Sequence, residues 1–135
     1  AIIGILATIG LVALNGAREK ARDATRKSDL GQIRTGLVLY SDDYGSTYPD
    51  TSGVASTALS VLAPTYITRV PDDPQTPTRD YYYASCSSGT TSPFYVLYAQ
   101  LESPEASGHY YWIKGDGTSD DDYTTGVPDC TSTAD

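Results

Sequence analysis

The sequence lacks the side chains on which most catalytic and metal sites depend. Its 135 residues contain one histidine, two cysteines and no methionine. No Gly-x-Ser-x-Gly, phosphate-loop or dinucleotide motif occurs, and the single histidine, His109, falls in a predicted strand. A zinc or redox site would need closely spaced cysteines or further histidines. We therefore expect a protein that is not an enzyme and that requires no cofactor.

The two cysteines, Cys86 and Cys130, lie far apart in a chain rich in serine, threonine, tyrosine and glycine. An even cysteine count without a metal motif favours one disulfide formed in an oxidising compartment. Spacing alone proves no connectivity, so two unpaired cysteines buried as small apolar residues remain the alternative.

Basic residues are scarce beyond position 34. Six of the nine lie between Arg18 and Arg34, whereas the chain after Arg34 has three basic and fourteen acidic residues, a net charge of −11. A domain this acidic repels phosphate backbones. We therefore expect no direct nucleic-acid binding by its surface.

No proline interrupts the first 48 residues, and residues 1–14 (AIIGILATIGLVAL) carry no charged side chain. The sequence permits one helix of about 40 residues, ~60 Å long at 1.5 Å per residue. The apolar run is shorter than the about 20 residues of a membrane span, and its abrupt start suggests truncation. A buried core helix is the alternative for this run.

Glycines weaken the first part of this predicted helix. Gly4, Gly10 and Gly16 each cost about 1 kcal/mol relative to alanine, and Thr8 and Ile9 are weak helix formers. A break between Gly4 and Gly16 and an unbroken helix therefore both remain open.

An apolar stripe follows along the same helix. Side chains that recur at steps of three and four residues predict packing of the helix on a globular head. They are Leu30, Ile33, Leu37, Tyr40 and Tyr44. We expect residues 1–24 to form a protruding helix and residues 25–135 to form the head.

The rest of the chain predicts an α+β fold with a small antiparallel meander on the long helix. Turn residues in Gly45–Gly53 predict the end of the long helix, and a short second helix is expected over 55–63. The proline-rich segment 69–79 is expected to form a loop. Aromatic and β-branched residues predict three strands, at 80–84, 94–101 and 109–113. The acidic tail, 115–135, would be held by the disulfide.

This order of features closely resembles the type IV pilins and the related major pseudopilins of type II secretion. Residues 1–50 join an apolar start, an Asn-Gly-Ala-Arg junction, basic residues and an amphipathic helix ending at Tyr-Pro. Residues 62–74 (LAPTYITRVPDDP) resemble the short helix and Tyr-x-x-x-x-Pro-x-Asp-Pro loop of that family. Family members begin with a further apolar run, so their methylated N-terminus and buried glutamate match no residue here.

The resemblance implies the structural subunit of an extracellular filament, a major pilin that supports adhesion, surface motility or DNA uptake. The subunit would sit in the inner membrane before the pilus assembly machinery adds it to a homopolymer. The basic segment 18–34 would then face acidic residues of neighbouring subunits or, earlier, anionic headgroups. Alternatives are a secretion pseudopilin and a membrane-anchored monomeric acidic binding domain. The expected filament core contacts are Ile2, Ile3, Ile5, Leu6, Ile9, Leu11, Val12, Leu14, Ala17 and Ala21.

Two residue groups invite further hypotheses. Asp116, Asp120, Asp121 and Asp122 offer oxygen ligands for calcium and loosely match the calcium loop of major pseudopilins, but they lack EF-hand spacing, so a solvated acidic loop is the alternative. The tyrosines of the predicted strands suggest sugar binding or electron conduction as hypotheses. Strand packing with hydroxyls that reach water is the more ordinary interpretation of those tyrosines.

Overall fold

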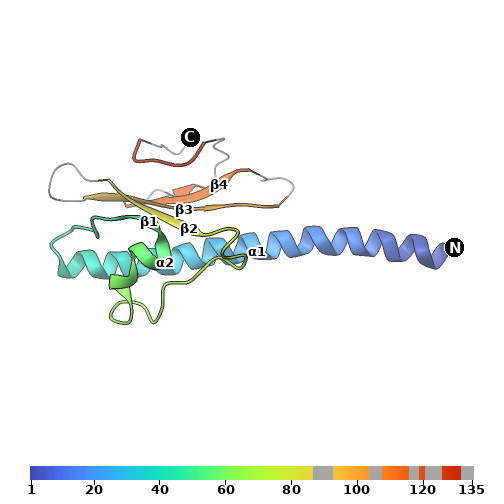
Figure 1. Ribbon diagram of the computed structural model, residues 1–135, viewed down its shortest axis with the longest axis horizontal. Coiled ribbons are helices and arrows are strands. Elements are labelled where there is room, and N and C mark those ends of the chain that lie inside the picture. The colour runs from blue at the N-terminus through green and yellow to red at the C-terminus, as the bar shows by residue number, and fades with distance from the viewer. Residues whose placement is uncertain (87–92, 104–107, 116–118, 121–125, 132–135) are drawn as a thin grey trace.

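A computed structural model of the chain describes residues 1–86, 93–103, 108–115, 119–120 and 126–131. One long helix, α1 (Ile2–Asp43), carries an antiparallel sheet on its C-terminal half, and its N-terminal half projects from the head (Figure 1). This is the α+β, pilin-like layout that the sequence predicted.

Helix α1 is unbroken over its 42 residues, so the break considered between Gly4 and Gly16 is absent from this structure. The alanine and leucine residues between the glycines are strong helix formers and keep the hydrogen-bond ladder continuous. The helix ends where Gly45 adopts a positive φ of 66°, which lets Ser46 N donate to the Ser41 carbonyl oxygen at 2.8 Å.

The sheet is a meander in the order β1-β2-β3-β4-β5, with every neighbouring pair antiparallel. The three predicted strands are β2 (Tyr81–Cys86), β3 (Phe94–Gln100) and β4 (Tyr110–Lys114). The expectation of about three strands missed the short edge strands β1 (Ser52–Val54) and β5 (Ser119–Asp120). Segments of three and two residues are too short to show the alternation by which a strand is read from sequence.

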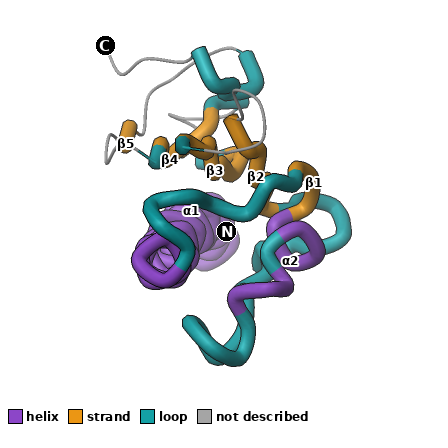
Figure 2. The backbone as a smooth tube through the Cα atoms, turned by 90° about the vertical axis from the view of Figure 1, so that its left-hand side faces the viewer, coloured by secondary structure: helices purple, strands orange, loops and turns teal. Residues whose placement is uncertain are grey.

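Two short helical segments follow β1 where the sequence predicted one helix. They are α2 (Ala55–Ala58) and the 3-10 helix η1 (Ser60–Leu62). Viewed along the molecule, α1 and α2 lie on the same side of the sheet (Figure 2). The proline-rich segment between η1 and β2 contains no helix or strand, as expected.

The core lies between the sheet and these helices. Leu30, Ile33 and Leu37 of α1 are completely buried, and Tyr40 packs against the same core while half-buried. Tyr44 differs from the predicted stripe, because it is 55% exposed and stacks on the ring of Tyr40. Tyr44 is the first residue after the helix, which ends at Asp43.

The tyrosines of β2 separate the two faces of the sheet. Tyr81 and Tyr83 are buried toward α1, whereas Tyr82 points to the opposite face and is 39% exposed. The Tyr81 hydroxyl donates to Asp29 Oδ2 at 2.7 Å, and the Tyr83 hydroxyl donates to the Pro49 carbonyl oxygen at 2.9 Å. Burial raises the pKa of both phenols well above the ordinary value of 10.0, so both remain neutral donors.

The predicted disulfide between Cys86 and Cys130 is present and closes a separation of 44 residues. It ties the segment 126–131 to the end of β2, on the side of the sheet opposite α1 (Figures 1 and 2). A cross-link of this length stabilises a fold by about 4 kcal/mol in the chain-entropy account. For a small domain that is a large share of the total stability.

Two leucines of α1 provide a matched test of the core. Leu37→Ala should lower the free energy of unfolding by about 2–5 kcal/mol, because it leaves a cavity in the buried stripe. Leu39→Ala removes the same atoms from a side chain that is 45% exposed, so its effect should be about 1 kcal/mol or less. Urea unfolding of the full chain in detergent micelles, followed by the fluorescence of the single Trp112, measures both. Equal losses would contradict the packing described here.

Candidate assembly surface

The N-terminal third of α1 is an uncovered apolar surface. All ten predicted filament contacts are exposed in the single chain, with relative exposures such as 84% for Ile3 and 63% for Ile9. An 18-residue window of α1 has a mean hydropathy of 1.4 and no buried residue, so by length and composition the helix can cross a membrane. Apolar area of this extent calls for lipid or protein to cover it.

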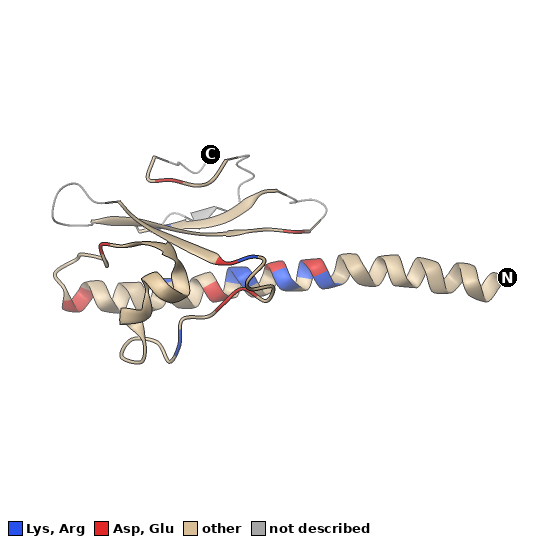
Figure 3. Ribbon diagram, viewed as in Figure 1, with Lys and Arg blue, Asp and Glu red and all other residues tan. Residues whose placement is uncertain are grey.

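Charged side chains begin where α1 approaches the head. Figure 3 shows Lys and Arg next to Asp and Glu on this part of the helix, whereas the projecting tip has none. Within this stretch one arginine, Arg26, is completely buried, with 0% exposure. A buried guanidinium needs partners for its charge and for its five N–H groups.

Arg26 joins three separate segments of the chain. Its Nε and Nη2 form two hydrogen bonds with the Asp73 carboxylate, at 2.6 and 3.0 Å, and Nη2 also donates to Gln75 Oε1 at 3.0 Å. Its Nη1 donates to Asp23 Oδ1 at 2.7 Å and to Glu102 Oε1 at 3.0 Å. We call Arg26, Asp23, Asp73 and Glu102 the Arg26 cluster.

The carboxylates of the cluster also hold main-chain groups in place. Asp23 accepts hydrogen bonds from the main-chain N–H groups of Glu102 and Ser103, which follow β3. Asp73 Oδ1 accepts the N–H of Gln75 at 2.8 Å in the loop that precedes β2. The cluster therefore fixes α1 to both loops at the end of the sheet that faces the projecting helix.

Electrostatics favour the charged forms of Glu102 and Arg26 in this cluster. Burial by itself raises the pKa of Glu102, but hydrogen bonds from Arg22 and Arg26 outweigh it, so that pKa lies below its ordinary value of 4.5. Burial lowers the pKa of Arg26, and hydrogen bonds to Asp73, Glu102 and Asp23 more than reverse that effect. Arg26 and Glu102 therefore face each other as an ion pair at neutral pH.

This arrangement corrects the expected role of part of the basic segment. Arg22 and Arg26 were expected to face acidic residues of neighbouring subunits or headgroups, yet both bind Glu102 of their own head. The sequence shows an Asp-x-x-Arg pair on one helical face, Asp23 and Arg26, and an Asp-Asp loop at 72–73, but no sequence pattern connects them to Glu102. The predicted boundary at residue 24 between the protruding helix and the head stays a prediction, although contacts between α1 and the head begin near this residue.

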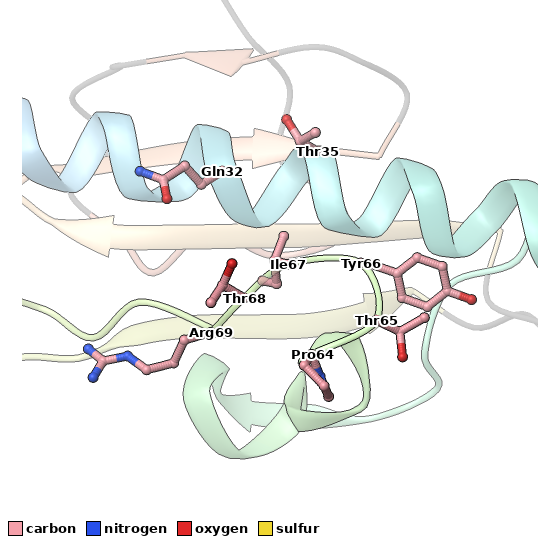
Figure 4. Close-up of a pocket in the computed structure, with 8 residues that line it drawn as sticks. All are labelled: Gln32, Thr35, Pro64, Thr65, Tyr66, Ile67, Thr68 and Arg69. Carbon is pink, nitrogen blue, oxygen red and sulfur yellow. The ribbon is translucent and has the colours of Figure 1, made fainter.

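A groove of about 540 Å³ lies between α1 and the loop 64–69, on the side of α1 away from the sheet (Figure 4). Ile67 extends from the loop to the helix, and a Cβ at Gly36 would meet Ile67 Cγ2 at 2.8 Å. Glycine at position 36 therefore lets the loop approach the helix closely. Arg69 and Tyr66 lie at opposite ends of the groove, and a hydrogen bond to Asp43 raises the pKa of Tyr66 to about 12.

The calcium hypothesis stays a prediction. Asp116, Asp121 and Asp122 lie outside the described residues, and so does the side chain of Asp120, whose main chain belongs to β5. Within the described ranges, no group of three or more His, Cys, Asp or Glu side chains is arranged to hold a metal ion. The three carboxylates of the Arg26 cluster converge on the Arg26 guanidinium, which occupies the position that a metal ion would take.

Comparisons with protein-family models, curated proteins and solved structures gave no match for this chain. The structural support for the family resemblance is therefore the layout itself: one long projecting helix, an antiparallel sheet and a disulfide that closes the C-terminal region.

Removal of the guanidinium tests the Arg26 cluster. Arg26→Met should lower the free energy of unfolding by about 3–5 kcal/mol, because it leaves the Asp23, Asp73 and Glu102 carboxylates close together without their counter-charge. Arg22→Met is the matched control at the exposed edge and should cost clearly less. Urea unfolding in micelles measures both variants. A loss for Arg22→Met as large as that for Arg26→Met would refute the central role of Arg26.

Acid should weaken the same junction. Because the pKa of Glu102 is depressed in the folded chain, its carboxylate stabilises the fold above pH 4.5, and this contribution disappears as the pH falls below that value. Glu102→Gln should therefore be less stable than the parent chain at neutral pH, and the difference should shrink on acidification. Unfolding curves between pH 7 and about 3 measure this, with Glu19→Gln as the control outside the cluster. A difference that is constant with pH would count against the ionised pair.

Proposed function

We propose that this chain is the structural subunit, a major pilin, of an extracellular type IV pilus-like filament. The observation that carries the proposal is the exposed apolar third of α1, joined to an acidic head. The pilin-like layout supports the same assignment. The filament as a whole would serve adhesion, surface motility or DNA uptake.

The apolar segment gives this proposal its mechanism. In the inner membrane, lipid covers the segment before assembly. After the assembly machinery extracts the subunit, the same surface is buried against α1 of other copies. The small side chains of Ala17 and Ala21 let those helices approach closely. A repeated contact between unlike surfaces of identical subunits then produces a helical polymer.

The charge distribution is compatible with heads on the outside of such a polymer. The chain after Arg34 carries the net charge of −11, and mutual repulsion and hydration favour the surface for these groups. Arg18 lies between the apolar segment and the head, outside the Arg26 cluster. We propose that it meets the acidic surface of neighbouring heads in the filament, or headgroups before assembly.

A secretion pseudopilin is the second candidate, because it would share this layout. The Cys86–Cys130 disulfide favours a pilus, since a calcium loop in place of a disulfide would be the feature of a major pseudopilin. The third candidate, a membrane-anchored monomer, would leave α1 beyond the bilayer without a contact surface. Electron microscopy of material sheared from cells separates a polymer from that monomer.

A bulky side chain within the projecting helix provides the functional test. Ala17→Phe keeps the segment apolar and should leave the chain in the membrane fraction, but the added ring blocks close approach of neighbouring helices. We expect filaments to be lost or reduced at least about tenfold in micrographs of sheared cell-surface material. Val61→Phe adds a ring at an exposed position of the head and should assemble normally.

Three results would contradict the proposal. One is a parent chain that never yields filaments while it accumulates in the membrane. Another is a detergent-free, soluble monomer of the intact protein in sedimentation. The third is an Ala17→Phe variant that assembles as well as Val61→Phe does.

A further inference from the structure

A second pocket, of about 250 Å³, lies on the face of the sheet opposite α1. It is at the end of the sheet where β2 and β4 begin and β3 ends. Its aromatic walls come from one tyrosine on each of these strands: Tyr82, Tyr98 and Tyr110. Tyr81 and Tyr83 are buried beneath the sheet and do not contribute, so the pocket uses a different set of rings from the core.

The three rings form a corner. Tyr82 and Tyr98 stack with an interplanar angle of 18° and a centroid distance of 5.4 Å, as cross-strand neighbours. Tyr110 meets Tyr98 at 81° with a centroid distance of 5.7 Å. The Tyr110 ring therefore lies nearly perpendicular to the stacked rings of Tyr82 and Tyr98. Such a corner offers apolar contact to a small ligand from two sides.

Polar side chains next to this corner supply both hydrogen-bond donors and acceptors. Arg79 Nη1 is buried and has no hydrogen-bond partner among the described residues, although it lines the pocket. Asp80 is positioned by the Thr76 hydroxyl, which donates to Oδ1 at 2.8 Å, and Gln100 adds an amide. The unmatched guanidinium nitrogen calls for an acceptor oxygen, because an unpaired buried donor is costly.

We propose that this pocket binds one neutral pyranose ring of a glycan. A pyranose presents an apolar face of C–H groups, which suits the tyrosine rings, and a rim of hydroxyls that donate and accept hydrogen bonds, which suits Arg79, Asp80 and Gln100. The volume is below the roughly 300–1,000 Å³ of sites for drug-sized ligands, so the pocket holds a single ring.

Charge argues for a neutral ligand. Among the described residues that line the pocket, Arg79 is the one cation and Asp80 the one anion, and their charges balance. The chain after Arg34 as a whole is strongly acidic. A nucleotide would also stack on tyrosine, but its phosphate would be repelled by that acidic surface. A sugar carrying a carboxylate suffers the same repulsion in weaker form.

The disulfide contributes to the same site. Val127, from the segment that Cys130 ties to β2, lines the pocket together with the strand tyrosines. The cross-link therefore holds one wall of the pocket in position. The site belongs to the single head, so its binding does not depend on the filament proposed above.

Saturation-transfer NMR on the full chain in zwitterionic, sugar-free detergent micelles tests the proposal. The probes are methyl glucoside, methyl galactoside, methyl mannoside and N-acetylglucosamine, with glucuronate as the anionic comparison. We expect at least one neutral sugar to bind with a dissociation constant of about 1–10 mM, and glucuronate to bind at least about tenfold more weakly. No transfer to any neutral sugar at ~50 mM would overturn the proposal.

Matched variants locate the binding. Tyr82→Leu and Arg79→Met should each weaken binding by about tenfold, whereas Tyr44→Leu and Arg69→Met, at exposed positions outside the pocket, should leave it unchanged. Circular dichroism checks that each variant is folded. Equal weakening by pocket and control variants would overturn the assignment. The assignment would also be overturned by tyrosine NMR signals that shift with protein concentration in the absence of sugar. Such shifts would assign the pocket to contact with a second copy of the chain.

Discussion

Burial of the Arg26 guanidinium is the constraint on which the geometry of this chain depends. The cost of removing a charge from water is offset only because Asp23, Asp73 and Glu102 converge on it from the helix and from two loops. Those loops lead into β2 and out of β3, so one ion cluster sets both the position of the sheet on α1 and the point at which the helix leaves the head. The hydrophobic stripe further along α1 supplies the larger transfer free energy, whereas the cluster fixes the direction of the helix.

The sheet divides the aromatic residues between two tasks. Its inner face buries Tyr81 and Tyr83 with the leucines of α1, and the hydroxyls of both tyrosines find acceptors there. On the opposite face, Trp112 and Val96 are also fully buried, although they lie outside that core. A second, thinner apolar layer thus exists on the face that bears the disulfide-linked segment. Both faces of a small sheet are protected, and the exposed remainder of the second face forms the tyrosine corner.

Much of the fold could be predicted from the sequence because its signals are local. The absence of proline before Pro49 and the stripe through Leu30, Ile33 and Leu37 predict the helix and its buried face. The cysteine count predicted the disulfide. The Arg26 cluster could not be predicted in this way, because its members are separated by up to 79 positions and only the fold shows which of many surface charges become buried. The tyrosine corner was missed for the same reason: adjacency of Tyr82, Tyr98 and Tyr110 depends on strand register, which short runs of tyrosine do not specify.

The projecting helix also acts as a lever whose pivot is Arg26. Ile2 lies 24 residues before that pivot, which corresponds to about 36 Å of helix at 1.5 Å per residue. A rotation of about 5° at the junction would therefore displace the tip by about 3 Å, more than half the pitch of one helical turn. Because side chains interlock on that scale, the angular stiffness of a few buried hydrogen bonds sets the tolerance with which a distant apolar tip can meet its neighbours.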